Sequence, residues 1–331
     1  MHQINRRTAL SLSLAAVALF AHAQAHAQAH AQADWPSRPI TLVLGFAPGG
    51  PNDLVARAMA LRLSEQLKQQ VIVDNKPGAS SNIAASIVAR AAPDGHTFLY
   101  HSSALALNTA LMPKMPIDTL RDLVPVNGTA TLPLVCIVEA SFPANNFREW
   151  AAQLRANPGK FNYGTAGVGN LTHLVGTMIL KVNGLSAVMM PYKGSSEALQ
   201  GLLNGSTQFQ FDSVNSPLQL IKGGKVKPLF VLSNQRSPVL PDVPTLAESG
   251  SNNIDSSAWQ GVMAPAKTPQ AIIERFAAEI FKAMNSPEMK AALAAQGAYS
   301  IASTPRQYAA FFAEEVVTNK RVGDEIGIKL E

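Results

Sequence analysis

The stretch FAPGGPND at residues 46–53 combines the residue types that let a protein backbone bind an anion. Gly49 and Gly50 allow a ligand to approach the main chain closely. The helix that the sequence predicts next presents free N–H groups and a partial positive charge to whatever lies in front of it. A structural role is equally open, because Pro-Gly-Gly is a common turn and Asn52 or Asp53 is a good helix N-cap.

A second glycine-rich loop, YGTAGVGNLTH at residues 163–173, repeats the order of strand, loop and helix. In open α/β sheets, ligands bind beyond the carboxyl ends of the strands, where such loops gather. Two of them, one in each half of the chain, could therefore face each other across a cleft and hold a small carboxylate. The candidate ligand-binding residues of the two loops are Phe46, Ala47, Pro48, Gly49, Gly50, Asn52, Asp53, Gly164, Thr165, Ala166, Gly167, Gly169, Asn170 and Thr172.

Two further places could contribute to the same cleft. Ser80 and Asn82 open a helix and could face the ligand, although capping the helix is the more common role of such residues. His101 and Ser102 end a strand and could also reach the cleft. His173 is interpreted as a packing or capping residue, because no partner for acid–base chemistry lies near it in the sequence.

Neither glycine-rich loop matches a nucleotide-binding motif. Gly45 to Gly50 has the glycine spacing of a P-loop, but Pro51 and Asn52 stand where Lys and Ser or Thr are required. Residues 164–169 read Gly-x-x-Gly-x-Gly, the reverse of the dinucleotide order. The sequence also has no Gly-x-Ser-x-Gly elbow, no His-Glu-x-x-His and no Cys/His metal spacing. We therefore expect no catalytic residue, no metal site and no cofactor.

The first 33 residues have the features of a secretory signal peptide. Arg6 and Arg7 form a short basic start, an apolar run follows, and an Ala-rich repeat offers several Ala-x-Ala cleavage sites. The apolar run is shorter than the roughly 20 residues needed to span a bilayer. The sequence therefore predicts export to a bacterial periplasm, with residues 1–33 removed.

Charge and cysteine content exclude other classes of protein. The whole chain has a net charge of +5, and removal of Arg6 and Arg7 leaves 25 basic against 22 acidic residues, or +3. This charge is mild and forms no basic runs, so no nucleic-acid partner is expected. Cys136, the single cysteine, lies in an apolar strand-like run and is interpreted as a buried core residue.

Strands and helices alternate along the chain, which predicts α/β domains with mostly parallel sheets flanked by helices. Two series of similar size indicate two domains, with crossings near 129–133 and 255–259. The expected first domain is 34–131 plus 258–331, and the second is 132–257. The predicted strands are 40–46, 71–75, 96–102, 133–139, 161–166, 186–192, 207–213 and 228–233, and the predicted helices are 53–67, 82–91, 147–156, 171–182, 195–203, 269–285, 287–296 and 305–323.

Six stretches of the chain, in this order, resemble the Bug receptors, which are the periplasmic solute-binding components of tripartite tricarboxylate transporters (TctC-like). They are WPSRPITLVLGFAPGGPNDLVARAMA, NKPGASSNIAASIVARAAPDGHTFLY, YGTAGVGNLTHL, PYKGSSEAL, RSPVLPDVPTLAESG and WQGVMAPAKTP. The resemblance covers essentially the whole mature chain. It implies a two-domain, Venus-flytrap periplasmic binding protein of the type II-like kind, with one small organic carboxylate bound between the domains.

The resemblance also implies partners and roles. The partners would be a large and a small membrane subunit of a transporter, and the receptor itself is expected to be a monomer. The loop from Phe46 to Asp53 would hold the proximal carboxylate of the ligand, and the loop from Gly164 to Thr172 would close from the other domain. Asp212 would line the cleft or the hinge.

Two other functions stay open on the sequence alone. A secreted α/β hydrolase-like enzyme could use His173 or His101 with Asp53 or Asp212, although the sequence supplies no recognisable nucleophile. A receptor that reports to a sensor kinase, rather than feeding a transporter, would have the same sequence features.

Overall fold

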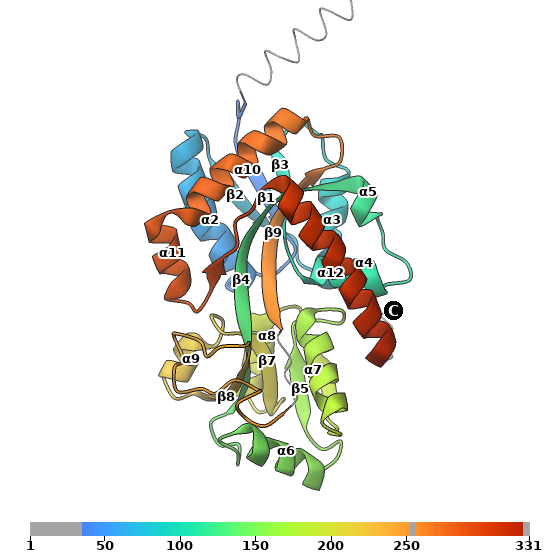
Figure 1. The fold of residues 1–331 in the computed structure, drawn as a ribbon, viewed down its shortest axis with the longest axis vertical. Coiled ribbons are helices and arrows are strands. Elements are labelled where there is room, and N and C mark those ends of the chain that lie inside the picture. Colours follow the sequence, from blue (N-terminus) through green and yellow to red (C-terminus); the bar gives the residue numbers. More distant parts are fainter. Residues whose placement is uncertain (1–34, 252–255, 327–331) are drawn as a thin grey trace, which may run out of the picture.

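The computed structural model describes residues 35–251 and 256–326. The predicted signal peptide, residues 1–33, lies outside the described residues. Two sheets that share strand β4 follow each other along the long axis of the molecule, with helices packed around both (Figure 1). The predicted α/β class is confirmed.

The first sheet has the strand order β2-β1-β3-β9-β4, and β10 pairs with β4. Strands β1, β2 and β3 are parallel, whereas β9 is antiparallel to both of its neighbours. The carboxyl ends of β1 and β3 therefore lie at the same edge, where the predicted ligand loops begin. The bounds are β1 Ile40–Leu44, β2 Val71–Asn75, β3 Thr97–Ser102, β4 Leu123–Glu139, β9 Ser257–Pro265 and β10 Tyr299–Ser300.

The second sheet contains the parallel strands β6, β5 and β7, followed by β4 and β8. Here β4 is antiparallel to β7 and β8. In each sheet most strands run in the same direction, as predicted, although β9 and β10 in the first sheet and β4 in the second run the opposite way. The long strands β4 and β9 run from one sheet toward the other (Figure 1). The remaining bounds are β5 Asn162–Thr165, β6 Val188–Pro191, β7 Phe209–Ser213 and β8 Val226–Leu232.

Helices cover both faces of the first sheet because successive strand residues point to opposite sides. Ile40, Leu42 and Leu44 of β1 share a core cluster with α2 and α10, whereas Val43 packs in another cluster with α3 and α12. The C-terminal helices therefore return to the first sheet. The bounds are α2 Pro51–Leu67, α3 Asn82–Ala89, α4 Ala104–Leu111, α5 Thr119–Asp122, α10 Gln270–Asn285, α11 Pro287–Ala294 and α12 Pro305–Ile326, with a short 3-10 turn at Ala79–Ser81.

The second sheet has its own core. Leu134, Cys136 and Val138 of β4 face one cluster, and Val135 and Ile137 face the other. Cys136 is fully buried, and burial raises the pKa of its thiol, so the prediction of a core cysteine is confirmed. The helices of this half are α6 Phe147–Ala156, α7 Leu171–Val182, α8 Ser195–Leu203 and α9 Leu218–Lys222.

Some predicted bounds were wrong. Strand β4 begins at Leu123 rather than at 133, because two register shifts near Pro125 and Gly128 let it continue past residues that usually end strands. The crossings expected near 129–133 and 255–259 consequently fall largely within β4 and β9, and β9 was not predicted at all.

The first site helix also differs from the prediction. Helix α2 begins at Pro51 rather than Asp53, since proline at the first helical position gives up an N–H that would have no partner there.

Candidate functional site

Four helices begin at one small cavity between the two sheets, with a volume of about 40 Å³. Helices α2 and α4 belong to the half with the first sheet, and α7 and α8 to the half with the second. The free N–H groups and partial positive charges of four helix N-termini therefore meet at one place. The lining residues from these termini are Gly50, Pro51 and Asn52 of α2, Ser103 of α4, Asn170, Leu171 and Thr172 of α7, and Gly194, Ser195 and Ser196 of α8.

The first glycine-rich loop is braced by Asp53, which is 3% exposed. Its Oδ2 accepts hydrogen bonds from the backbone N–H of Gly49 (3.0 Å) and from Nε of Arg57 (2.9 Å), and its Oδ1 accepts from Nδ2 of Asn75 (2.9 Å). Burial alone would raise the pKa of Asp53, but these hydrogen bonds outweigh it and lower the pKa. Asp53 thus shapes the loop and remains ionised.

The N-cap of α2 is Gly50, so neither Asn52 nor Asp53 caps this helix as the sequence suggested. Gly49 has a φ of +81°, a left-handed conformation that glycine adopts readily. Phe46, Ala47, Gly50 and Asn52 line the cavity. Pro48, Gly49 and Asp53 are not among its lining residues and act through the shape of the loop.

The second glycine-rich loop is held by its own helix. Asn170 is the N-cap of α7, and its Oδ1 accepts from the N–H of Thr172 (3.1 Å). The hydroxyl of Thr172 accepts from the N–H of Ala166 (3.0 Å), and Nδ1 of His173 accepts from the N–H of Gly169 (3.3 Å). His173 therefore braces the loop, and burial lowers its pKa.

Asp212 lines the cavity from the end of β7 and is 1% exposed. Its Oδ1 accepts from Oγ of Ser195 (2.9 Å) and from the N–H of Ser213 (2.8 Å), and its Oδ2 accepts from Nε2 of Gln210 (2.9 Å). Burial raises the pKa of this carboxyl to about 6 despite these donors. Asp212 fixes the start of α8 at the wall of the cavity.

Apart from Asp212, neutral groups supply the polar chemistry of this cavity, and none of its described lining residues is Lys or Arg. Oδ1 of Asn52 and Oγ of Ser103 are buried without a partner in the part of the chain that the structure describes. A buried polar atom without a partner destabilises a fold, so such atoms commonly contact water or a ligand. Hydroxyl, amide and backbone donors at four positive helix ends can hold a carboxylate without a cationic side chain.

Several predicted site residues lie away from this cavity. The ring of His101 is fully buried, with Nε2 bonded to the hydroxyl of Tyr308 (3.0 Å) and Nδ1 to the carbonyl of Ser102 (3.0 Å). Burial lowers its pKa to about 4, so His101 is a neutral core residue. Ser102 follows it on the opposite side of β3 and does line the cavity.

Asn82 and the start of the second loop also point elsewhere. Asn82 accepts from Nδ2 of Asn108 (3.1 Å), and it neither caps α3 nor lines the cavity. Gly164 and Thr165 lie in β5, and Thr165 is fully buried behind the loop.

Ser80, Gly167 and Gly169 line a second, outer cavity of about 480 Å³, which shares Phe46 and Ala166 with the inner one. The hydroxyl of Ser80 donates to the carbonyl of Val168, which joins a loop of the first half to the glycine-rich loop of the second.

The profile of a family described as the tripartite tricarboxylate transporter family receptor (TctC) matches residues 55–328 of this chain. The chain belongs to this receptor family. It is 36% identical over 320 residues to the protein BugT of Bordetella pertussis, covering 96% of this chain and 98% of BugT.

Solved structures of similar proteins share the fold of this TctC-type receptor. Rpa4515 of R. palustris, solved with adipate, has a TM-score of 0.87 and 31% identity, over 89% of this chain and 99% of its own. MatC (Rpa3494) of Rhodopseudomonas palustris, solved with bound malate, has a TM-score of 0.82 and 29% identity, over 87% of this chain and 99% of its own. The receptor therefore has the fold of periplasmic binding proteins.

Sequence reasoning missed part of the receptor's cavity. Gly194, Ser195 and Ser196 have a detectable signal, since a glycine and two serines precede a predicted helix, as N-cap regions do. Ser103 could have been found as the residue after Ser102. Gln260 comes from the unpredicted strand β9, and no local pattern marks it.

Within residues 35–251 and 256–326 of the receptor, no group of His, Cys, Asp and Glu is arranged to hold a metal ion. Over the same ranges, no helix is long and apolar enough to cross a membrane.

Proposed function

We propose that this chain is a periplasmic binding protein that captures a small organic carboxylate and delivers it to the membrane subunits of a tripartite tricarboxylate-type transporter. The observation that carries the proposal is the meeting of four helix N-termini, two from each half of the chain, at one cavity. Such termini bind anions through backbone N–H groups. The family membership supports the link to a large and a small transporter subunit.

Residues 34–131 with 258–331, and residues 132–257, would act as two domains that close around the ligand. Four core clusters support this division, because two lie in each half, while a smaller cluster of Leu107, Leu111 and Leu174 joins the halves. Strands β4 and β9 connect the halves and pair with each other, so bending of this pair would serve as the hinge.

The ligand class follows from the size of the cavities and from the relatives. The inner cavity of about 40 Å³ has room for a carboxylate group, and the rest of a ligand would extend past Phe46 and Ala166 into the outer cavity of about 480 Å³. Adipate and malate, each bound to a relative, are both small aliphatic dicarboxylates. We therefore expect aliphatic dicarboxylates to bind.

Export with cleavage of residues 1–33, a monomeric state and the absence of catalysis belong to the same proposal. The contacts of the candidate catalytic groups support a non-enzymatic role. His101 is bonded to Tyr308 and Ser102, and His173 to Gly169. Asp53 and Asp212 are occupied by donors that shape the loops.

The experiment is calorimetric titration of the mature protein with adipate and malate, before and after substitution of Gly50. A Cβ at Gly50 would contact the carbonyl of Ala47 at 3.7 Å and Oγ of Ser196 at 4.0 Å, so alanine fits and leucine would fill the cavity. Gly50→Leu should lower the affinity by at least about 100-fold, while Gly50→Ala should retain binding. Unchanged affinity in a folded Gly50→Leu protein would reject this site.

A further inference from the structure

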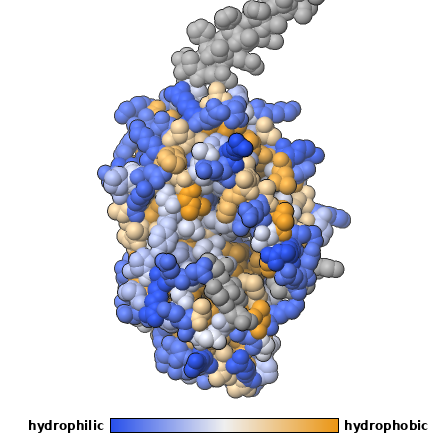
Figure 2. Space-filling view, viewed as in Figure 1, coloured by the Kyte–Doolittle hydropathy of each residue, from blue (hydrophilic) through white to orange (hydrophobic). Residues whose placement is uncertain are grey.

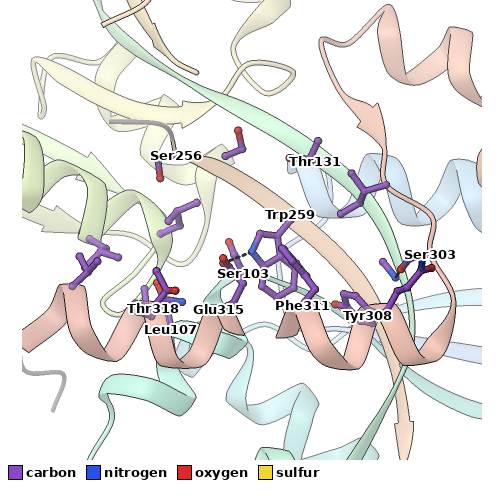
Figure 3. Close-up of a pocket in the computed structure, with 18 of the residues that line it drawn as sticks. Ser103, Leu107, Thr131, Ser256, Trp259, Ser303, Tyr308, Phe311, Glu315 and Thr318 are labelled. Carbon is purple, nitrogen blue, oxygen red and sulfur yellow. Dashed lines mark hydrogen bonds between the residues drawn. The ribbon is translucent and has the colours of Figure 1, made fainter. Parts of the chain in front are cut away.

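A cavity of about 800 Å³ lies outside the candidate carboxylate site, along helix α12 (Figure 3). One face of α12 forms the long wall of this cavity. Its lining residues Gln307, Phe311, Glu315 and Val322 are spaced so that they share one side of the helix. Trp259 of β9 lines it as well, and α4 and α7 contribute further residues. The volume is within the roughly 300–1,000 Å³ typical of small-molecule sites.

The wall of this α12 cavity is mainly aromatic and aliphatic. Trp259 and Phe311 meet edge to face at 5.0 Å between ring centroids, and Tyr308 and Phe311 are stacked at 6.3 Å. The aliphatic lining is Leu107, Leu171, Leu174, Met178, Ile301 and Val322. On the face of the molecule that carries α12, hydrophobic residues are exposed in scattered groups among hydrophilic ones (Figure 2). The cavity therefore offers its apolar surface to a small molecule rather than to a broad partner.

Glu315 is the only acidic side chain among the described lining residues, and none of those residues is Lys, Arg or His. Its carboxylate is partly buried, and Oε2 accepts from Nε1 of Trp259 at 2.7 Å (Figure 3). No ion pair of Glu315 with a described residue is formed. A partly buried carboxylate among aromatic rings, without a cation, is the arrangement that attracts an ammonium group.

We propose that the α12 cavity binds a small organic cation, namely a protonated amine with an apolar body. Its ammonium would pair with Glu315 and contact the ring of Phe311, and its hydrocarbon part would lie against Leu107, Leu174 and Met178. This site adjoins the carboxylate site but does not depend on the proposed function. The two cavities share only Ser103 and Leu171 among their lining residues.

The competing explanation is purely structural, with Glu315 present only to tie α12 to β9 through Trp259. Glu315→Gln separates the two explanations, because the glutamine carbonyl can still accept from Nε1 of Trp259 while the charge is removed. Glu314→Gln is the matched control, since Glu314 is the exposed neighbour on the same helix.

The test is calorimetric titration, without any carboxylate ligand, with 2-phenylethylammonium and with neutral 2-phenylethanol. Wild-type protein and Glu314→Gln should bind the ammonium at least about tenfold more tightly than the alcohol. Glu315→Gln should bring the two affinities together. Equal affinities in the wild type, binding of neither probe, or an unchanged preference in Glu315→Gln would overturn the proposal, whatever the carboxylate titrations show.

Discussion

The cavity at the helix N-termini and the α12 cavity obtain their charge by different means. In the first, the positive potential comes from four helix ends, and its acidic side chain, Asp212, accepts hydrogen bonds from Ser195, Ser213 and Gln210. In the second, the charge sits on Glu315, which has a hydrogen bond from Trp259 and no ion pair with a described residue.

This difference shows that the presence of an acidic residue does not by itself indicate the charge of a ligand. A carboxylate saturated by neighbouring donors organises the wall, and the field in front of it is set by the helix ends. A carboxylate with one neutral donor retains most of its capacity to attract a cation.

The largest expected effect is on the pH dependence of stability in Asp212→Asn. The folded pKa of about 6 lies above the ordinary value of 3.8, so Asp212 favours the folded state at low pH. This contribution is complete below about pH 4 and is lost as the pH rises through about 6. Between those limits the free energy of unfolding of the wild type should fall by up to roughly 3 kcal/mol relative to that of the variant. Urea unfolding of both proteins measures this difference.

The asparagine at position 212 can be accommodated because of its neighbour. Oε1 of Gln210 is buried without a partner among the described residues, so the amide of Gln210 can turn and accept from the new N–H group. Equal pH dependence in the two proteins would show that Asp212 is ionised at no cost in the folded state. The neighbouring donors would then offset burial completely, and the raised pKa of Asp212 would be rejected.

A smaller effect is expected from removal of a helix cap at the cavity. Asn170→Ala removes the N-cap residue of α7. Asn146→Ala removes the N-cap residue of α6, where the side chain of Asn146 accepts from the N–H of Glu149 at 3.0 Å. Each should lower the unfolding free energy by about 1 kcal/mol. Only Asn170→Ala should weaken dicarboxylate binding, by roughly tenfold in calorimetry. Equal ligand affinity in the two variants would mean that the α7 terminus does not contact the ligand.

Local signals explain how much of this site could be predicted from the sequence. Helix α7 was predicted at both ends, because Asn170 is a cap and Asn183 and Gly184 stop the helix. Both glycine-rich loops were placed correctly between strand and helix for the same reason. Such signals depend on a few neighbouring residues, and tertiary packing does not override them here.

The parts that could not be predicted depend on pairing between distant segments. Gln260 reaches the cavity only because β9 pairs with both β3 and β4. The sequence gives no reason to prefer His101 or Ser102 as a cavity residue. In the structure the two side chains point to opposite sides of β3, and only Ser102 lines the cavity. The side that faces away from the cavity packs in an aromatic cluster around His101, to which α12 supplies Tyr308 and Phe312 and β9 supplies Trp259.

The smallest expected effect comes from the loop that joins the two halves at the outer cavity. Ala79, Ser80 and Ser81 have φ values of 46°, 49° and 78°, left-handed conformations that disfavour side chains. Ser81→Gly should therefore stabilise the fold by about 1 kcal/mol, because the buried hydroxyl of Ser81 has no described partner to lose. Ser80→Gly relieves the same strain but removes the hydrogen bond to Val168, so its net effect on stability should be smaller. Thermal unfolding of the two variants measures this difference, and a larger gain for Ser80→Gly would show that the bond to Val168 adds nothing to the contact between the halves.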